Sequence, residues 1–437
     1  MDGLAERTVP AGEGDAQAVD ACAARCLGRW RDSLQLRDID CHLARQVARL
    51  SASDSPWLLL ASALVSRATS DGHVCLDLQE HAGRVLGVVT ADDEPIVAPP
   101  LQEWLSVLRA CSAVGDVGAG TPLVLDDAGR LYLYRYWHYE QSLAVNLLRR
   151  VGPPSAVDDD SLAPILERLF PARGEPADDA DTDWQKVAAA AAAVQRFCVI
   201  SGGPGTGKTT TVARLLTLLL EQHELATGPD QSDRRTQPLR IVLTAPTGKA
   251  AARLQESLRG VLPSIATSER IRDLIPRDAS TIHRLLGVME HSSRFRFNVD
   301  RPLPVDVVVV DEASMVDLAL MAKLAAAVPD TARLILLGDK DQLASVEAGA
   351  VLGELCTGGE VWSAPMAALL TRLSGQRVPG ASRPAAPIDD AIVVLRHSYR
   401  FGAGSGIGQQ PTAVNRGDVA ASLAVLEWQL EGQRLDD

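Results

Sequence analysis

The fold is decided by FCVISGGPGTGKTTTVARLLTLLLEQ, residues 197–222. Four apolar residues predict a buried strand, a glycine-rich turn follows, and the apolar periodicity after the turn predicts a helix. The alternation continues downstream, where RIVLTAP, VDVVVVDEA and ARLILLGD predict strands and GKAAARLQESL and LALMAKLAAAV predict helices. Strands that alternate with helices are typical of a parallel sheet covered by helices, so we expect an α/β fold.

The glycine-rich turn predicts a phosphate-binding loop. It matches G-x-x-x-x-G-K-[ST] in the strand-to-helix context that this motif requires. Backbone N–H groups of such a loop converge on phosphates, Lys208 supplies a point charge to the terminal phosphates, and Thr209 can ligate Mg2+. The residues expected to form the loop are Gly202, Gly203, Pro204, Gly205, Thr206, Gly207, Lys208 and Thr209.

Two carboxylates, Asp311 and Glu312, follow the apolar run at 307–310. A parallel sheet delivers side chains to its ligand crevice at the carboxyl ends of its strands. We expect Asp311 in the Mg2+ shell and Glu312 to polarise the attacking water, because phosphoryl transfer to water needs an oriented nucleophile. The alternative, that the pair only caps the next helix, is disfavoured by the phosphate-loop motif upstream.

Two glutamines stand where a nucleotide would bind. Gln342 follows the predicted strand LILLGD, and a glutamine beside a triphosphate can report the γ-phosphate by hydrogen bonding. Gln185 lies one helix before the phosphate loop. The residues alone leave open whether Gln185 reads the edge of adenine or only begins a solvated helix.

Size and composition bound the class of protein. The chain has 437 residues and a mass of 46.5 kDa, which predicts two or three domains. No apolar run reaches the roughly 18 residues of a membrane span, so we expect no membrane partner. Seven cysteines without a signal sequence predict reduced thiols and a cytoplasmic protein. A metal set drawn from Cys22, Cys26, Cys41 and His42 fits no standard zinc spacing, which favours structural thiols.

Charge and turn-forming residues divide the chain. The net charge of −13 lies mainly in the first 180 residues, which hold 16 basic and 27 acidic side chains. Runs that combine Pro with Asp or Gly predict linkers. The predicted organisation is a mainly helical domain suited to docking on a protein at 1–150, with a hairpin turn at 126–129, an acidic Pro-rich linker at 151–182, the parallel-sheet domain at 183–372, a Pro/Gly-rich linker at 373–388 and the start of a further domain at 389–437.

Seven segments, in chain order, resemble the Q motif and motifs I, Ia, Ib, II, III and IV of superfamily 1 DNA helicases. They are WQKVAAA, GGPGTGKTT, APTGKAAARL, STIHRLLG, VVVDEASMVD, GDKDQLASVEAGAVLGEL and LRHSYRF. Within that superfamily the chain resembles the RecD family, the alpha subunits of exodeoxyribonuclease V. The resemblance runs from about residue 183 to the end, and HVCLDL and YLYRYWHYEQ extend it into the N-terminal region.

The resemblance implies an ATP- and Mg2+-dependent motor that moves 5′ to 3′ along single-stranded DNA. It also implies a heterotrimer with RecB-like and RecC-like subunits that acts on duplex ends in double-strand break repair. Gln185 would contact adenine, Thr210 the phosphates, and Gln342 would couple hydrolysis to movement. Arg400 would reach the γ-phosphate from a second RecA-like domain, as a group worth about 10³ to 10⁵ in rate. The implied DNA contacts are Pro246, Thr247, Lys249, Thr281 and His283.

The chain departs from the family pattern after LRHSYRF. Members of the family continue into motifs V and VI, whereas the sequence ends at Asp437. We therefore expect a C-terminally truncated member with an incomplete second RecA-like domain, which binds ATP·Mg2+ but hydrolyses it slowly and does not unwind DNA alone. Two alternatives remain open, a stand-alone 5′ to 3′ DNA helicase and a non-catalytic scaffold subunit that binds nucleotide as a structural element.

Overall fold

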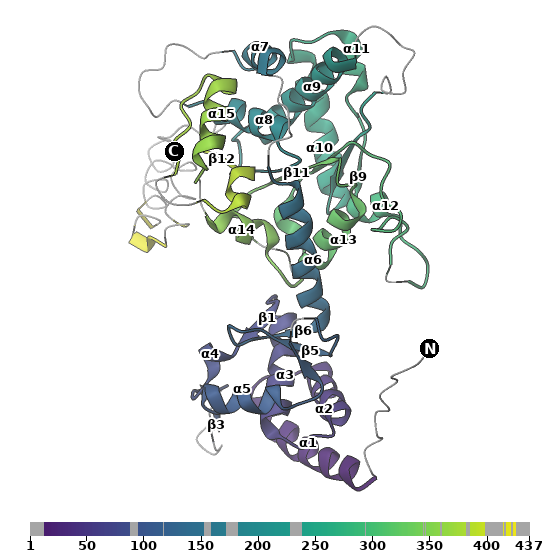
Figure 1. The fold of residues 1–437 in the computed structure, drawn as a ribbon, viewed down its shortest axis with the longest axis vertical. Helices are drawn as coiled ribbons and strands as arrows, with labels where there is room; N and C mark the ends of the chain where they lie inside the picture. The colour runs from purple at the N-terminus through teal and green to yellow at the C-terminus, as the bar shows by residue number, and fades with distance from the viewer. Residues whose placement is uncertain are drawn as a thin grey trace, which may run out of the picture. The chain divides into compact units, whose positions relative to one another are not determined.

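The chain folds into two compact units, which Figure 1 shows as ribbons. The first comprises Met1–Gln141 with Val346–Gly349, and the second comprises Ser142–Ser345 with Ala350–Asp437. The computed structural model describes residues 13–87, 95–116, 118–152, 159–171, 182–227, 238–292, 294–343, 345, 347–358, 361–381, 385–397, 414, 417–420 and 423–424. The two units are described separately below.

The first unit is built on three helices, α1 (Glu13–Ser33), α2 (Asp38–Ser51) and α3 (Pro56–Ser70). Helix α3 carries the run LLLASALV, and every residue from Leu58 to Ser66 is buried. A helix that is apolar on all sides must be surrounded, and α3 accordingly packs against both α1 and α2. The mainly helical character expected for this region is therefore present in its core.

A small sheet completes the first unit, in the strand order β1-β6-β5-β4. Strands β5 (Leu123–Leu125) and β6 (Arg130–Leu133) form the predicted hairpin, and the amide N–H of Gly129 donates to the carbonyl of Asp126 at 3.1 Å. The remaining elements of this unit are β1 (Cys75–Asp77), α4 (Leu78–His81), β2 (Val85–Leu86), β3 (Ile96–Val97), α5 (Leu101–Arg109) and β4 (Val114–Gly115).

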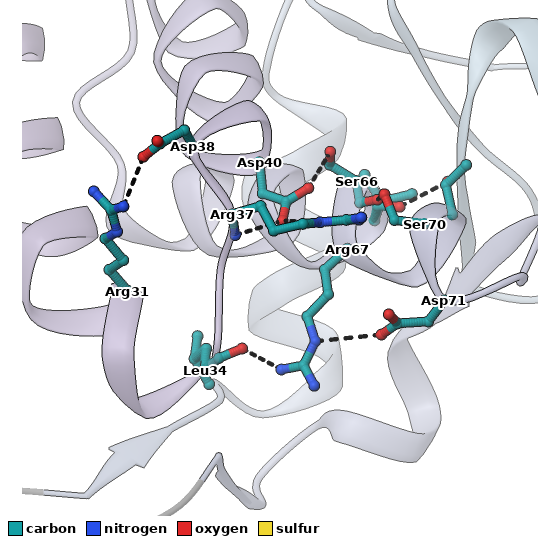
Figure 2. Close-up of polar contacts among 11 residues, drawn as sticks. Arg31, Leu34, Arg37, Asp38, Asp40, Ser66, Arg67, Ser70 and Asp71 are labelled. Carbon is teal, nitrogen blue, oxygen red and sulfur yellow. Dashed lines mark hydrogen bonds and ion pairs between the residues drawn. The ribbon is translucent and has the colours of Figure 1, made fainter.

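Figure 2 shows the polar contacts that fix α2 against α3. Asp40 in α2 is fully buried, and its carboxylate accepts hydrogen bonds from the Ser66 hydroxyl at 2.6 Å and from the Arg37 amide at 2.9 Å. Arg67 of α3 donates to the carbonyl of Leu34, just beyond the end of α1. An unpaired buried carboxylate is costly, so these donors determine how the three helices meet.

Gly87 lies so close to the backbone of α1 that we expect the first unit to tolerate substitution poorly at this glycine. Gly87 has φ +76°, and a Cβ placed there would lie 2.2 Å from the Ser33 carbonyl oxygen at the end of α1. We expect Gly87→Ala to destabilise this unit by several kcal/mol, since backbone must move, whereas Gly83→Ala adds only the strain of its positive φ, about 1 kcal/mol. Hydrogen exchange of the amides in α1 to α3 measures the difference. Equal loss of protection in the two variants would show that the contact with Ser33 is unimportant.

The second unit contains a six-stranded sheet in the order β12-β7-β11-β10-β8-β9, and all five pairings are parallel. The α/β fold predicted from the sequence is therefore confirmed. The strands are β7 (Phe197–Gly202), β8 (Ile241–Ala245), β9 (Ala279–Thr281), β10 (Val307–Val310), β11 (Arg333–Gly338) and β12 (Ile392–Leu395). Because all strands run the same way, their carboxyl ends share one edge of the sheet.

Helices cover both faces of this sheet (Figure 1). Val307 and Val309 of β10 belong to the main core with α8 and α9, while the alternate residues Val308 and Val310 are fully buried on the other face. The helices of this unit are the part of α6 (Tyr134–Arg150) from Ser142 onward, α7 (Asp159–Leu169), α8 (Trp184–Val194), α9 (Lys208–Thr227), α10 (Gly248–Val261), α11 (Glu269–Leu274), α12 (Ile282–Leu286), α13 (Leu318–Ala327), α14 (Val351–Leu355) and α15 (Ala364–Ser374). Among the described residues, four short 3₁₀ turns also occur, of which η3 (Ala313–Met315) lies in the site described below.

Two predicted boundaries are corrected by the structure. Helix α7 is the one short helix, SLAPILERLF, that the sequence predicts within the exposed linker 151–182, but its Leu162 and Leu166 are fully buried in the second unit's core. Strand β12 was predicted to begin a further domain at 389–437, yet it pairs in parallel with β7. Both segments therefore belong to the fold of the nucleotide-binding unit, because their apolar residues complete its core.

Three findings concern membrane spans, cysteines and metal ligands. Within the described residues, no helix combines the length and apolarity that a bilayer crossing requires. All seven cysteines are free thiols, and burial raises the pKa of Cys26 to about 11. In the described part of the chain, no three His, Cys, Asp or Glu side chains gather as a metal site would require.

Candidate nucleotide and nucleic-acid site

Three neighbouring strands of the second unit carry the predicted nucleotide-binding residues at their carboxyl ends. β7 leads into the phosphate loop, β11 into the segment with Gln342, and β10 into Asp311 and Glu312. The strands lie side by side in register, with Gly338 opposite Ser201. Residues separated by more than a hundred positions in sequence are thus brought to one edge of the sheet.

The phosphate loop, residues 202–208, has the backbone geometry that its glycines predict. Gly205 and Gly207 have φ values of +79° and +81°, which L-residues rarely adopt. A Cβ at Gly202 would lie 2.7 Å from the Thr206 hydroxyl and 3.0 Å from the Cβ of Leu395. The loop is therefore packed tightly against the end of β12, and it opens directly into α9.

Cationic and hydroxyl groups line the start of α9. The ammonium of Lys208 donates to the carbonyl of Gly202 and to that of Gly203, the latter at 3.3 Å. Thr209 and Thr210 follow in the first turn and are half-buried. A helix N-terminus with free N–H groups and an adjacent ammonium favours a phosphate. The predicted loop residues are therefore brought together around one helix end.

Asp311 and Glu312 lie in unusual environments at the end of β10. Burial raises the pKa of Asp311 to about 6, although the amide N–H of Glu312 donates to its carboxylate at 3.0 Å and the charge of Lys208 acts in the opposite direction. Glu312 has φ +52° and ψ +42°, a left-handed conformation that costs a non-glycine residue free energy. Both features are characteristic of functional carboxylates.

The raised pKa of Asp311 predicts a pH-dependent stability. A carboxyl group whose folded pKa lies above its unfolded value stabilises fully below the unfolded pKa, and this contribution is lost as pH rises through about 6. Asp311→Asn should therefore raise the free energy of unfolding at pH 7.5 by on the order of 2 to 3 kcal/mol, and change it little at pH 4. Thermal unfolding without nucleotide or Mg2+ measures the gain.

The same strand offers a control of opposite sign. Arg240 holds the pKa of Asp306, just before β10, below its usual range by hydrogen bonding to its carboxylate. Stability from such a group is present above the unfolded pKa and is lost as pH falls, so Asp306→Asn should destabilise at pH 7.5 and be nearly neutral at low pH. A loss of stability at pH 7.5 in both variants would contradict the effect of burial on Asp311.

The segment after β11 is held by contacts from both of its neighbours. The Ser201 hydroxyl of β7 accepts a hydrogen bond from the amide of Lys340 at 3.0 Å. The Ser314 hydroxyl of η3 donates to the side-chain oxygen of Gln342 at 3.1 Å. Gln342 is itself exposed, so its position at the site's edge depends on these serines, neither of which the sequence singled out.

Two predicted nucleotide contacts need comment. Gln185 is only 4% exposed, and its amide nitrogen donates to the carbonyl of Thr206 at 2.9 Å, so it supports the phosphate loop directly. Arg400 lies outside the described residues. Asp339, which the sequence reading missed, faces the loop, since its Oδ2 is 4.0 Å from a Cβ placed on Gly203. Its position directly after a predicted strand was the available signal.

The predicted DNA-contact residues gather on the adjacent strands of the same edge. Thr247 caps α10 and Thr281 caps α12, each through its side-chain oxygen, and Ala245 of β8 lies opposite Thr281 of β9. Lys249 and His283 are exposed in the first turns of these helices, and Pro246 is half-buried. The two segments therefore place hydroxyls, helix N-termini and the Lys249 ammonium along the same edge.

An aromatic residue that the sequence reading missed lies beside this group. The Phe295 ring packs edge-on against His283 at 5.6 Å, and the Lys323 ammonium lies 5.5 Å from the centre of the same ring. The alternation of basic and aromatic residues in SRFRF, 293–297, was the available signal. Rings next to cations are a recurring feature of surfaces that bind single strands.

Two protein-family models match the chain, one in the first structural unit and one mainly in the second. Residues 32–132 match the family model of the RecBCD enzyme subunit RecD, N-terminal domain. Residues 185–348 match the family model of an AAA domain. The first match falls within the first unit and the second covers most of the parallel sheet. The second match also indicates that the chain uses a nucleotide.

Relatives in bacteria extend the similarity along most of the chain. It is 42% identical over 390 residues to RecBCD enzyme subunit RecD of Mycobacterium tuberculosis, covering 89% of the chain and 57% of that protein. It is 39% identical to RecBCD enzyme subunit RecD of Haemophilus influenzae, covering 84% and 58%. It is 36% identical to ATP-dependent RecD2 DNA helicase of Deinococcus radiodurans, covering 60% and 28%. The chain thus spans less than two thirds of the length of these relatives. The N-terminal family model and the relatives agree, and the chain is similar to RecD proteins along most of its length.

Proposed function

We propose that the chain is an ATP-dependent 5′ to 3′ DNA helicase subunit of an exodeoxyribonuclease V complex that acts in recombinational repair of double-strand breaks. The observation that carries the proposal is the arrangement along one sheet edge. Lys208, Asp311, Glu312 and Gln342 end three adjacent strands, and Thr247 leads the DNA-contact group on the next two. ATP binding and DNA binding would therefore act on the same rigid sheet.

The residues at this edge fit ATP with Mg2+. Mg2+ prefers hard oxygen ligands, which the buried carboxylate of Asp311 and the hydroxyl of Thr209 provide, and it would neutralise phosphate charge. Lys208 would bind the terminal phosphates, Glu312 would polarise water, and Gln342 would contact the γ-phosphate. Arg400 would add a cation from a second motor domain. Gln185 would read adenine with its remaining amide oxygen, because its nitrogen is bonded to Thr206.

DNA would be held by its backbone, without reading of base sequence. Pro246, Thr247 and Lys249 at the start of α10, with Thr281 and His283 at the start of α12, offer N–H groups, hydroxyls and one ammonium. Such groups contact phosphates, and phosphate contacts fix the register of a protein on DNA without selecting a sequence. A motor that moves along any single strand requires this kind of contact.

The relatives support a proposal about the partners. Proteins named RecBCD enzyme subunit RecD match the chain, and residues 32–132 match the N-terminal domain of that family. We infer a heterotrimer with RecB-like and RecC-like subunits, in which the first unit docks on a partner protein. The similarity to ATP-dependent RecD2 DNA helicase supports the alternative of a free-standing helicase, although that match covers only 60% of the chain.

The test is ATP turnover by the chain, with and without single-stranded DNA, alone and after mixing with RecB-like and RecC-like subunits. We expect DNA-stimulated turnover in the complex and slow turnover by the chain alone. A duplex with a 5′ single-stranded tail should be unwound, and one with a 3′ tail should not be unwound by this subunit. Tight ATP binding with no DNA-stimulated turnover in any assembly would favour the scaffold function.

A further inference from the structure

We propose that Ser314 is a positioning residue that orients the side-chain amide of Gln342, so that its N–H groups face the γ-phosphate. The inference rests on the proposed function, because it assigns how the coupling glutamine of that site is held. Its basis is the hydrogen bond from the Ser314 hydroxyl to the amide oxygen of Gln342, at 3.1 Å. No motif assigned a role to this serine.

The backbone explains why Ser314 reaches this position. Glu312 turns the chain sharply through its left-handed conformation, φ +52°, into the short helix η3. That turn brings Ser314 back beside the end of β11, where a Cβ on Gly338 would lie 3.2 Å from the Ser314 amide nitrogen. Such a Cβ would also lie 2.4 Å from the Leu352 side chain, so the glycine favours the close packing of η3 and α14 against β11. Ser314 is only 6% exposed, so its hydroxyl has little access to water.

The direction of the hydrogen bond matters for the chemistry. A glutamine amide has an oxygen that only accepts and a nitrogen that only donates. Phosphate oxygens are acceptors, so Gln342 can recognise a γ-phosphate only through its nitrogen. In the structure the Ser314 hydroxyl donates to the amide oxygen, and this orientation leaves the N–H groups of Gln342 for the phosphate.

The segment that bears Gln342 is fixed at a second point. The amide of Lys340 donates to the Ser201 hydroxyl at 3.0 Å, and Ser201 is fully buried near the end of the strand that leads into the phosphate loop. The backbone amide of Gln342 donates to the backbone carbonyl of Asp339 at 3.2 Å. The backbone before Gln342 is thus held by the strand that leads into the phosphate loop, and the Gln342 side chain is held by the turn that follows Asp311 and Glu312. The side-chain nitrogen of Gln342 is left available for the phosphate.

The experiment compares affinity for a triphosphate with affinity for a diphosphate in the full chain. Calorimetric titrations with Mg2+ and either AMP-PNP or ADP are made on the wild type, Ser314→Ala, Ser314→Thr, Gln342→Ala and the Ser314→Ala/Gln342→Ala double variant. We expect Ser314→Ala to weaken AMP-PNP binding about three- to tenfold and to leave ADP binding unchanged. Ser314→Thr, which keeps a hydroxyl, should bind AMP-PNP with the affinity of the wild type. The double variant should bind no more weakly than Gln342→Ala.

The control is Ser264→Ala, which removes an exposed hydroxyl that donates to the Val261 carbonyl at 2.7 Å in the same unit. It should bind both nucleotides as the wild type does. The inference, but not the proposed function, would be overturned if Ser314→Ala lost the same affinity for AMP-PNP and for ADP. It would also be overturned if Ser314→Ala bound AMP-PNP as the wild type does while Gln342→Ala bound it more weakly. An unimpaired Gln342→Ala would also overturn it, since there would be nothing to position. A wild type that binds neither nucleotide would refute the proposed function together with it.

Discussion

Lys208→Ala is expected to reduce DNA-stimulated ATP turnover by at least about a hundredfold, the usual cost of removing one group that stabilises charge in the transition state. The ammonium stands at the start of α9, between the carbonyls of Gly202 and Gly203, and nothing else in the loop carries a positive charge. Alanine therefore leaves the phosphates with backbone N–H groups only. Steady-state phosphate release at saturating single-stranded DNA measures the loss.

Lys249→Ala provides the matched control, because it removes an exposed lysine from the first turn of α10 on the same sheet edge. It should weaken binding to single-stranded DNA and reduce the salt dependence of that binding by roughly one phosphate contact, with nucleotide affinity unchanged. Turnover within tenfold of wild type in Lys208→Ala would refute the motor reading. Loss of complex assembly in Lys208→Ala, with the fold intact, would favour the scaffold alternative.

The candidate site could be predicted from the sequence because its motifs are local. A phosphate loop needs one strand, one turn and one helix, all within residues 197–222, so spacing alone locates Lys208. Asp311 could be placed for a similar reason, since a continuous apolar run at 307–310 marks a buried parallel strand and its end is the ligand edge. Only the order of the strands, which decides that these ends are neighbours, required the structure.

Domain boundaries were harder to predict because they depend on distant contacts. Proline, glycine and aspartate around 151–182 and 373–388 resemble linker composition. Yet α7, inside the first segment, and β12, just after the second, contribute apolar side chains to the core of the second unit. β12 pairs with β7 almost two hundred residues away, and such parallel pairing leaves no local trace in the sequence.

The hydrogen bonds that support the site residues could not be predicted from the sequence, because they also join residues that are distant along the chain. Gln185 was predicted to meet a ligand, and its motif cannot show that its amide nitrogen is bonded to Thr206. Ser314 lies in a stretch whose chemistry was assigned to the carboxylates before it. A side chain that acts through another side chain is defined by an interatomic distance, here the one from Ser314 to Gln342. Spacing in the chain does not encode it.

Glu312→Gln is expected to lower ATP turnover by about 10² to 10⁴ while nucleotide binding is retained, because the loss of general-base assistance has that size. Glutamine has nearly the volume of glutamate, so the left-handed turn at this position and the contact from its amide to Asp311 can persist. What disappears is a carboxylate that can accept a proton from water. Single-turnover hydrolysis, measured alongside AMP-PNP affinity, separates the chemical step from binding.

Asp317→Asn is the matched control for Glu312→Gln, because it also removes one carboxylate charge from this segment. It tests whether the loss of turnover depends on the position of Glu312 or only on the change in charge. Asp317 lies five residues downstream, and its side chain accepts from the Leu320 amide at 2.9 Å to cap α13. Asparagine caps a helix equally well, so turnover should stay near that of wild type. Glu312→Gln turnover within tenfold of wild type, or an equal loss in both variants, would show that water is activated elsewhere. A selective loss at Glu312 would instead locate the chemistry at the end of β10, where the backbone is strained.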